Sequence, residues 1–176
     1  MRHDVPVSSL DLVLDIGTLS RAALTSALGA RGVGLNAHAE LLLSHHVFEV
    51  PAPRSVRVIS RTVGDLDLPD GASLGQVVAA ADRLGLGPLP PDTGPYLRLA
   101  LEDQPSAPDS VMSAGRAPSG ALTVASRPLS DDDRFPKGFY LRTVDGRPWL
   151  RGYCCDDEHL WAPSDEFAFA QLTPRS

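Results

Sequence analysis

The densest group of reactive side chains in this sequence is the segment "CCDDEHLW", from Cys154 to Trp161. Thiolate, carboxylate and imidazole groups can hold a metal ion or perform nucleophilic and acid–base chemistry. The spacing matches no metal-binding pattern such as a paired CxxC, so we expect no metal site. The favoured interpretation is the end of a strand followed by a solvated acidic turn. The weak catalytic candidates are Cys154, Asp157 and His159, with Cys155 as an alternative thiol for a dyad.

Other motifs for chemistry are weaker still. His38 and His45 are seven residues apart, which in a helix separates them by about 10 Å along the axis and prevents them from sharing one ion. The glycines of "GARGVG" (29–34) follow a predicted helix, whereas a dinucleotide-binding loop follows a strand and opens a helix. The sequence has no phosphate-binding P-loop and no G-x-S-x-G elbow. We therefore expect no cofactor.

The segment "GFYLRTVDGRPWLRGYCC" (138–155) has the pattern of a β-hairpin. Asp145-Gly146 is a typical two-residue turn between alternating residues. This turn predicts the cross-strand pairs Val144–Arg147, Arg142–Trp149 and Tyr140–Arg151. Alternation then directs Phe139, Leu141 and Leu150 toward the core. Pro148 lacks an amide donor, so we expect the returning strand to be an edge at that position.

The opposite face of this hairpin carries arginine and aromatic side chains, which we predict to form an exposed surface. Its members are Tyr140, Arg142, Arg147, Trp149, Arg151 and Tyr153, joined by Tyr96 and Arg98 of a predicted strand over 95–101. One interpretation is a solvated face on which arginines lie over aromatic rings. The other is a binding surface, because the guanidinium fork matches phosphate and carboxylate groups.

Helix signals dominate the first half of the chain and strand signals the second. Thr18, Asn36 and the Ser73/Gln76 capping-box pair predict three helix starts. β-Branched or alternating segments predict strands over 55–63, 95–101, 121–127 and 166–172, besides the hairpin. The expected fold is α+β, with two or three N-terminal helices packed on one face of a mostly antiparallel sheet of about five or six strands.

Length and composition indicate one soluble domain. The 176 residues are 43% hydrophobic and 22% charged, which is globular composition. We expect a single α+β domain over 1–176 with a long Pro/Ser/Gly/Ala loop at about 102–120, a length typical of functional or disordered loops. No signal peptide or run of about 20 apolar residues is apparent, so we expect a cytoplasmic protein without membrane contact.

Three stretches, "GVGLNAHAELLL" (32–43), "LGLGPLPPDTGPYLRLALEDQP" (84–105) and "GFYLRTVDGRPWLRGY" (138–153), resemble a group of bacterial cytoplasmic proteins known only as sequences. The resemblance covers most of the chain and implies one bacterial cytoplasmic domain. It implies no activity, cofactor or catalytic residue.

The leading functional hypothesis is a non-enzymatic binding module that recognises an anionic ligand or an acidic protein through the arginine–aromatic face. A nucleotide or single-stranded nucleic acid could stack on the rings, although the net charge of −6 does not favour nucleic acid. The alternative is a small enzyme for a phosphate- or carboxylate-bearing substrate, with the long loop as a lid. The second alternative is an acidic antitoxin or immunity-type protein that binds through loop carboxylates such as those of 131–133.

Overall fold

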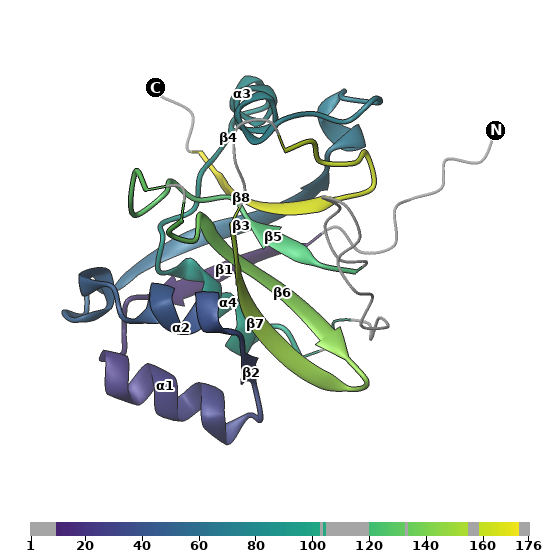
Figure 1. Cartoon of the computed structure of the whole chain (residues 1–176). Helices are drawn as coiled ribbons and strands as arrows, with labels where there is room; N and C mark the ends of the chain where they lie inside the picture. The colour runs from purple at the N-terminus through teal and green to yellow at the C-terminus, as the bar shows by residue number, and fades with distance from the viewer. Residues whose placement is uncertain (1–9, 103, 105–119, 133, 155–158, 173–176) are drawn as a thin grey trace.

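The computed structural model describes residues 10–102, 104, 120–132, 134–154 and 159–172. These residues form a strongly curled α+β fold around one mixed sheet (Figure 1). The sheet strands are β1 (Asp11–Ile16), β2 (Gly34–Leu35), β3 (Arg54–Thr62), β4 (Leu86–Gly87), β5 (Leu122–Val124), β6 (Gly138–Val144), β7 (Arg147–Tyr153) and β8 (Glu166–Gln171). The helices are α1 (Arg21–Ala30), α2 (Ala37–Leu43), α3 (Leu74–Arg83) and α4 (Thr93–Ala100), with 3-10 turns η1 (His46–Phe48) and η2 (Gly64–Leu66).

The strand order across the sheet is β1-β3-β8-β5-β6-β7-β2, and β4 also pairs with β8. Most pairs are antiparallel, whereas β5–β8 and β2–β7 are parallel. The α+β class agrees with the prediction from the sequence, but the eight strands in the described residues exceed the five or six expected. The short strands β2 and β4 and the whole of β1 were not anticipated.

Both faces of the sheet are covered, which corrects the prediction of helices on one face only. Leu24 of α1, Leu42 of α2 and Leu97 of α4 belong to one apolar cluster. Val77 of α3 belongs to a second cluster on the opposite face, and Figure 1 shows α3 on the other side of β8 from α1, α2 and α4. The physical reason is that the central strands are apolar on both sides. The helices are also interspersed with strands rather than confined to the N-terminal half.

The predicted helix starts are confirmed at two of three positions. Asn36 accepts a hydrogen bond from the Ala39 amide, and Ser73 and Gln76 form the reciprocal capping box at the start of α3. The first helix begins later than predicted: its N-cap is Ser20, whose side chain accepts from Ala23, rather than Thr18. Ser and Thr are both good caps, so local sequence did not distinguish the two positions.

The segment 95–101, predicted to be a strand, is the helix α4. Leu97, Leu99 and Leu101 suggested period-two alternation, but the segment is a helix in which Thr93 to Arg98 are all buried. Pro95 lies in the first helical turn, where the missing amide donor leaves no intrahelical bond unmade. Tyr96 and Arg98 are consequently placed by α4 and do not belong to the sheet.

The hairpin register is confirmed residue for residue. Val144 pairs with Arg147, Arg142 with Trp149 and Tyr140 with Arg151. The turn residues Asp145 and Gly146 both have positive φ, as a type I′ turn requires. β7 is not a free edge along its whole length, because β2 pairs with it at Trp149 and Leu150. Pro148 has no amide hydrogen to donate, and it lies just outside this short ladder.

None of the helices in the described residues is long and apolar enough to cross a membrane.

Two glycines in helices provide an opposed pair of stability predictions. An added Cβ on Gly94 of α4 would stand 2.6 Å from Phe139 of β6, whereas one on Gly29 of α1 would meet nothing within 4 Å. Gly94→Ala should therefore lower the unfolding free energy by about 1–3 kcal/mol through overpacking. Gly29→Ala should raise it by about 0.5 kcal/mol. Chemical denaturation measures both, and stabilisation by Gly94→Ala would contradict the close packing of α4 on β6.

Candidate functional site

The outer face of the β6–β7 hairpin is less open than predicted. Arg142 is 0% exposed, and Tyr140 and Tyr153 are 9% exposed. Tyr96 and Arg98, predicted to extend the same face, lie on α4 and are buried as well. The prediction of a broad exposed arginine–aromatic surface is therefore wrong. The residues of this face that reach solvent are Arg147, which is exposed, and Trp149 and Arg151, which are half-buried.

These three side chains form a stack that we call the arginine–tryptophan ladder (Arg147, Trp149 and Arg151). The guanidinium carbons of Arg147 and Arg151 lie 4.8 Å and 4.4 Å from the ring centroid of Trp149. Such contacts are worth about 0.5–1 kcal/mol each at exposed sites. Arg147 Nε also donates to the carbonyl of Gly32 at 3.2 Å. The ring itself is held by the β2 backbone, since a Cβ on Gly34 would stand 2.6 Å from it.

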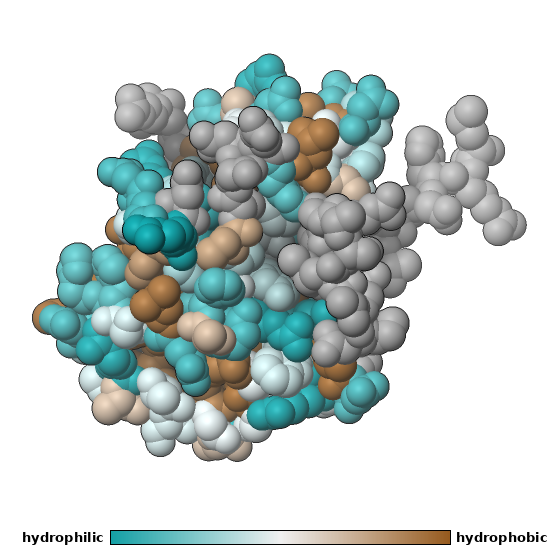
Figure 2. Space-filling model, viewed as in Figure 1, coloured by the Kyte–Doolittle hydropathy of each residue, from teal (hydrophilic) through white to brown (hydrophobic). Residues whose placement is uncertain are grey.

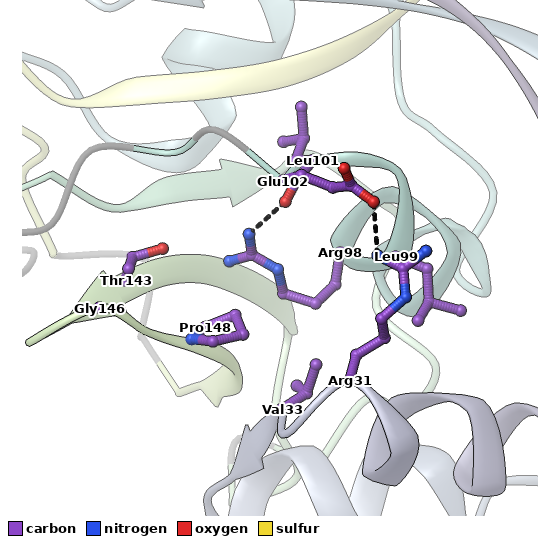
Figure 3. Close-up of a pocket in the computed structure, with 9 residues that line it drawn as sticks. All are labelled: Arg31, Val33, Arg98, Leu99, Leu101, Glu102, Thr143, Gly146 and Pro148. Carbon is purple, nitrogen blue, oxygen red and sulfur yellow. Dashed lines mark hydrogen bonds and ion pairs between the residues drawn. The ribbon is translucent and has the colours of Figure 1, made fainter.

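The inner face of the hairpin borders a pocket of about 240 Å³ between α4, the residues leading into β2, and the hairpin tip (Figure 3). Its polar lining consists of Arg31, Arg98, Glu102 and Thr143. Arg31 and Glu102 form an ion pair at 2.6 Å between well-exposed side chains, which places them at the pocket mouth. Arg98 is 3% exposed and forms the deep wall.

Arg98 connects the end of α4 to the hairpin. Its Nη2 donates to the Leu101 carbonyl at 2.7 Å, and its Nη1 donates to the backbone carbonyls of Arg142 and Trp149 at 3.3 and 3.4 Å. A fourth acceptor, the Gln104 amide oxygen, lies 2.6 Å from Nη1. Burial lowers the pKa of Arg98 to about 10, so the guanidinium is still protonated at neutral pH. A buried cation is therefore held entirely by neutral oxygens within the described residues.

Gln104 completes this polar cluster. Its side-chain amide donates to the carbonyls of Leu141 at 2.9 Å and Gly120 at 3.3 Å, while its oxygen accepts from Arg98. The hydroxyl of Thr143 lies 3.4 Å from the same oxygen. Gln104, Thr143 and Arg31 were not predicted from the sequence. They lie at the start of the long loop, in β6 and at the end of α1, and no local sequence pattern connects these three places.

The catalytic candidates do not converge. Cys154 Sγ lies 3.8 Å and 3.9 Å from the ring nitrogens of His38, with no hydrogen bond to His159. His159 instead packs edge-on against Trp161, with ring centroids 4.8 Å apart. Asp157 and Cys155 lie outside the described residues, as does most of the predicted loop at 102–120. Within the described part of the chain, no three His, Cys, Asp or Glu side chains are grouped as a metal site would require.

The environment of Cys154 does not favour a nucleophile. Partial burial raises the pKa of the Cys154 thiol, and the nearby charge of Lys137 opposes this only in part. Reactive cysteines have lowered pKa values, because the thiolate is the attacking form.

Comparison with known proteins adds no assignment: no protein-family model, no curated protein and no solved structure matches this chain.

The raised pKa of Cys154 is testable by alkylation. In a Cys155→Ser variant, which leaves Cys154 as the remaining cysteine, the rate of iodoacetamide reaction should rise with pH to a midpoint above that of the same protein unfolded in denaturant. Lys137→Gln should shift the folded midpoint higher still, because the lysine charge favours the thiolate. A folded midpoint below the unfolded one would show an activated thiol and revive the enzyme hypothesis.

Proposed function

We propose that the protein is a non-enzymatic binding module that recognises an acidic protein segment through the arginine–tryptophan ladder. The proposal is carried by Arg147. Its exposed guanidinium lies over the Trp149 ring and is in no ion pair among the described residues. An arginine in this position can accept a carboxylate in a bidentate geometry.

The stack also prepares its arginines for binding. A free arginine loses side-chain entropy when it is fixed in a complex. Arg147 and Arg151 are already restrained by the ring between them, and the ring is restrained by Gly34. Part of the side-chain entropy that binding would otherwise remove is thus already lost on folding. The net charge of −6 favours an acidic protein segment that makes a small local contact over a long nucleic acid, which would meet repulsion elsewhere.

The other hypotheses gain no support from the site. The enzyme hypothesis needs a thiol or imidazole converging with the arginines, but Cys154 contacts His38 and His159 contacts Trp161. The antitoxin hypothesis needs free loop carboxylates at 131–133. Asp132 is engaged locally by Arg134, which bonds it through both backbone and side chain, and residue 133 lies outside the described residues.

Binding of short poly-L-glutamate at low salt tests the ladder. Arg147→Gln together with Arg151→Gln should weaken binding by at least about tenfold, because both guanidinium contacts are lost. The unfolding free energy should fall by about 1–3 kcal/mol, through loss of two cation–π contacts and of the Arg147 hydrogen bond to the Gly32 carbonyl. The matched control is Arg57→Gln with Arg83→Gln, which removes two exposed charges elsewhere and should bind as the wild type does.

Equal losses in the two double variants would show that binding follows overall charge and not the ladder. Tighter binding of an oligothymidine than of poly-L-glutamate, lost in the ladder variant, would replace the acidic protein with nucleic acid as the partner.

A further inference from the structure

The pocket on the inner face of the hairpin has an uneven charge distribution. At its mouth, Glu102 is already neutralised by Arg31 at 2.6 Å. At its deep wall, Arg98 is 97% removed from solvent and is in no ion pair within the described residues. The three side chains sum to one net positive charge, which resides at the buried end. Such an arrangement attracts a single negative charge into the pocket.

The deep guanidinium also retains hydrogen-bonding capacity. An arginine side chain carries five N–H donors. The acceptors of its Nη1 and Nη2 are backbone carbonyls and the Gln104 amide, all of them neutral, and its Nε is buried with no acceptor among the described residues. Figure 3 shows the Arg98 guanidinium among the lining residues, above Pro148 and to the right of Thr143. A carboxylate beside this guanidinium would supply the missing charge.

The remaining lining restricts what accompanies the anionic group. Val33, Leu101 and Pro148 give the pocket apolar walls. Its volume of about 240 Å³ is smaller than the roughly 300–1,000 Å³ typical of sites for drug-sized ligands. The occupant therefore has a short carbon skeleton. A dianion is disfavoured, because the lining side chains carry only one net positive charge.

We propose that this pocket is a binding site for a small organic monocarboxylate, with Arg98 as the primary contact of the carboxylate and the apolar walls holding the carbon chain. The site lies on the opposite face of the hairpin from the arginine–tryptophan ladder, and it goes beyond the proposed function. The two are separable, because the Arg147→Gln and Arg151→Gln double variant should bind the monocarboxylate normally.

The experiment is a titration of the protein with sodium butyrate, followed by amide chemical shifts in NMR spectra. Butyrate should bind with a dissociation constant of about 1 mM, as expected for a six-heavy-atom ligand, and should shift amides of α4 and the hairpin. The matched probe is butyramide, which has the same shape without the charge and should bind at least about tenfold more weakly. Inorganic phosphate should also bind more weakly than butyrate.

Variants separate the roles of the lining residues. Arg98→Met should abolish butyrate binding, while Val33→Phe should block the pocket without touching Arg98. Glu102→Gln should tighten binding about three- to tenfold, because it leaves the positive charge of Arg31 at the pocket mouth without its ion-pair partner. The control for this gain is Glu49→Gln, which removes an exposed carboxylate beside Arg21, outside the pocket lining, and should leave binding unchanged.

A gain in affinity cannot arise from misfolding, so Glu102→Gln tests the proposal even where Arg98→Met fails to fold. Equal binding of butyrate and butyramide, unchanged affinity in Glu102→Gln, or shifts confined to residues away from α4 and the hairpin would each overturn the proposal. Tighter binding of phosphate than of butyrate would overturn the assignment to a monocarboxylate.

Discussion

The burial of the Arg98 guanidinium is the constraint on which the candidate sites depend. Its carbonyl acceptors on Arg142 and Trp149 are 44 and 51 residues away in sequence, so a single side chain fixes α4 against both strands of the hairpin. Taking an arginine cation out of water costs several kcal/mol unless polar groups compensate. Here carbonyl dipoles and Gln104 provide the compensation. The arrangement orders the hairpin and at the same time leaves a cation that has no counterion in the part of the chain that the structure describes.

The hairpin consequently has two chemically different faces joined by one backbone. On the outer face the Trp149 ring carries Arg147 and Arg151, whereas on the inner side its carbonyl accepts from Arg98. Displacement of β7 would therefore disturb both features. The second link between α4 and the sheet is the bidentate pair of Arg54 with the buried Asp92 at the start of the helix. The helix is thus anchored at both ends by arginine, once to a carboxylate and once to neutral oxygens.

Local sequence signals correctly predicted the features that short-range interactions determine. The Asp145-Gly146 turn specified the hairpin register, and the caps at Asn36 and Ser73 specified two helices. These signals failed for the features that tertiary packing determines. The α4 segment looked like a strand because Leu97, Leu99 and Leu101 alternate with other residues, and that error placed Arg98 on the wrong element. Alternation correctly put Tyr140 and Arg142 on one face, but it could not show that this face is buried.

The most direct test of the central claim is the NMR signal of the Arg98 Nε–H group, assigned by its loss in Arg98→Met. A buried Nε–H that is shielded from water, with no acceptor among the residues that the structure describes, should give a slowly exchanging peak at neutral pH. On addition of butyrate the peak should move, with the same dissociation constant as the backbone amides, because the carboxylate charge then lies beside the guanidinium. A peak that stays in place at saturating butyrate would show that Arg98 is a structural connection alone and that the anion site lies elsewhere.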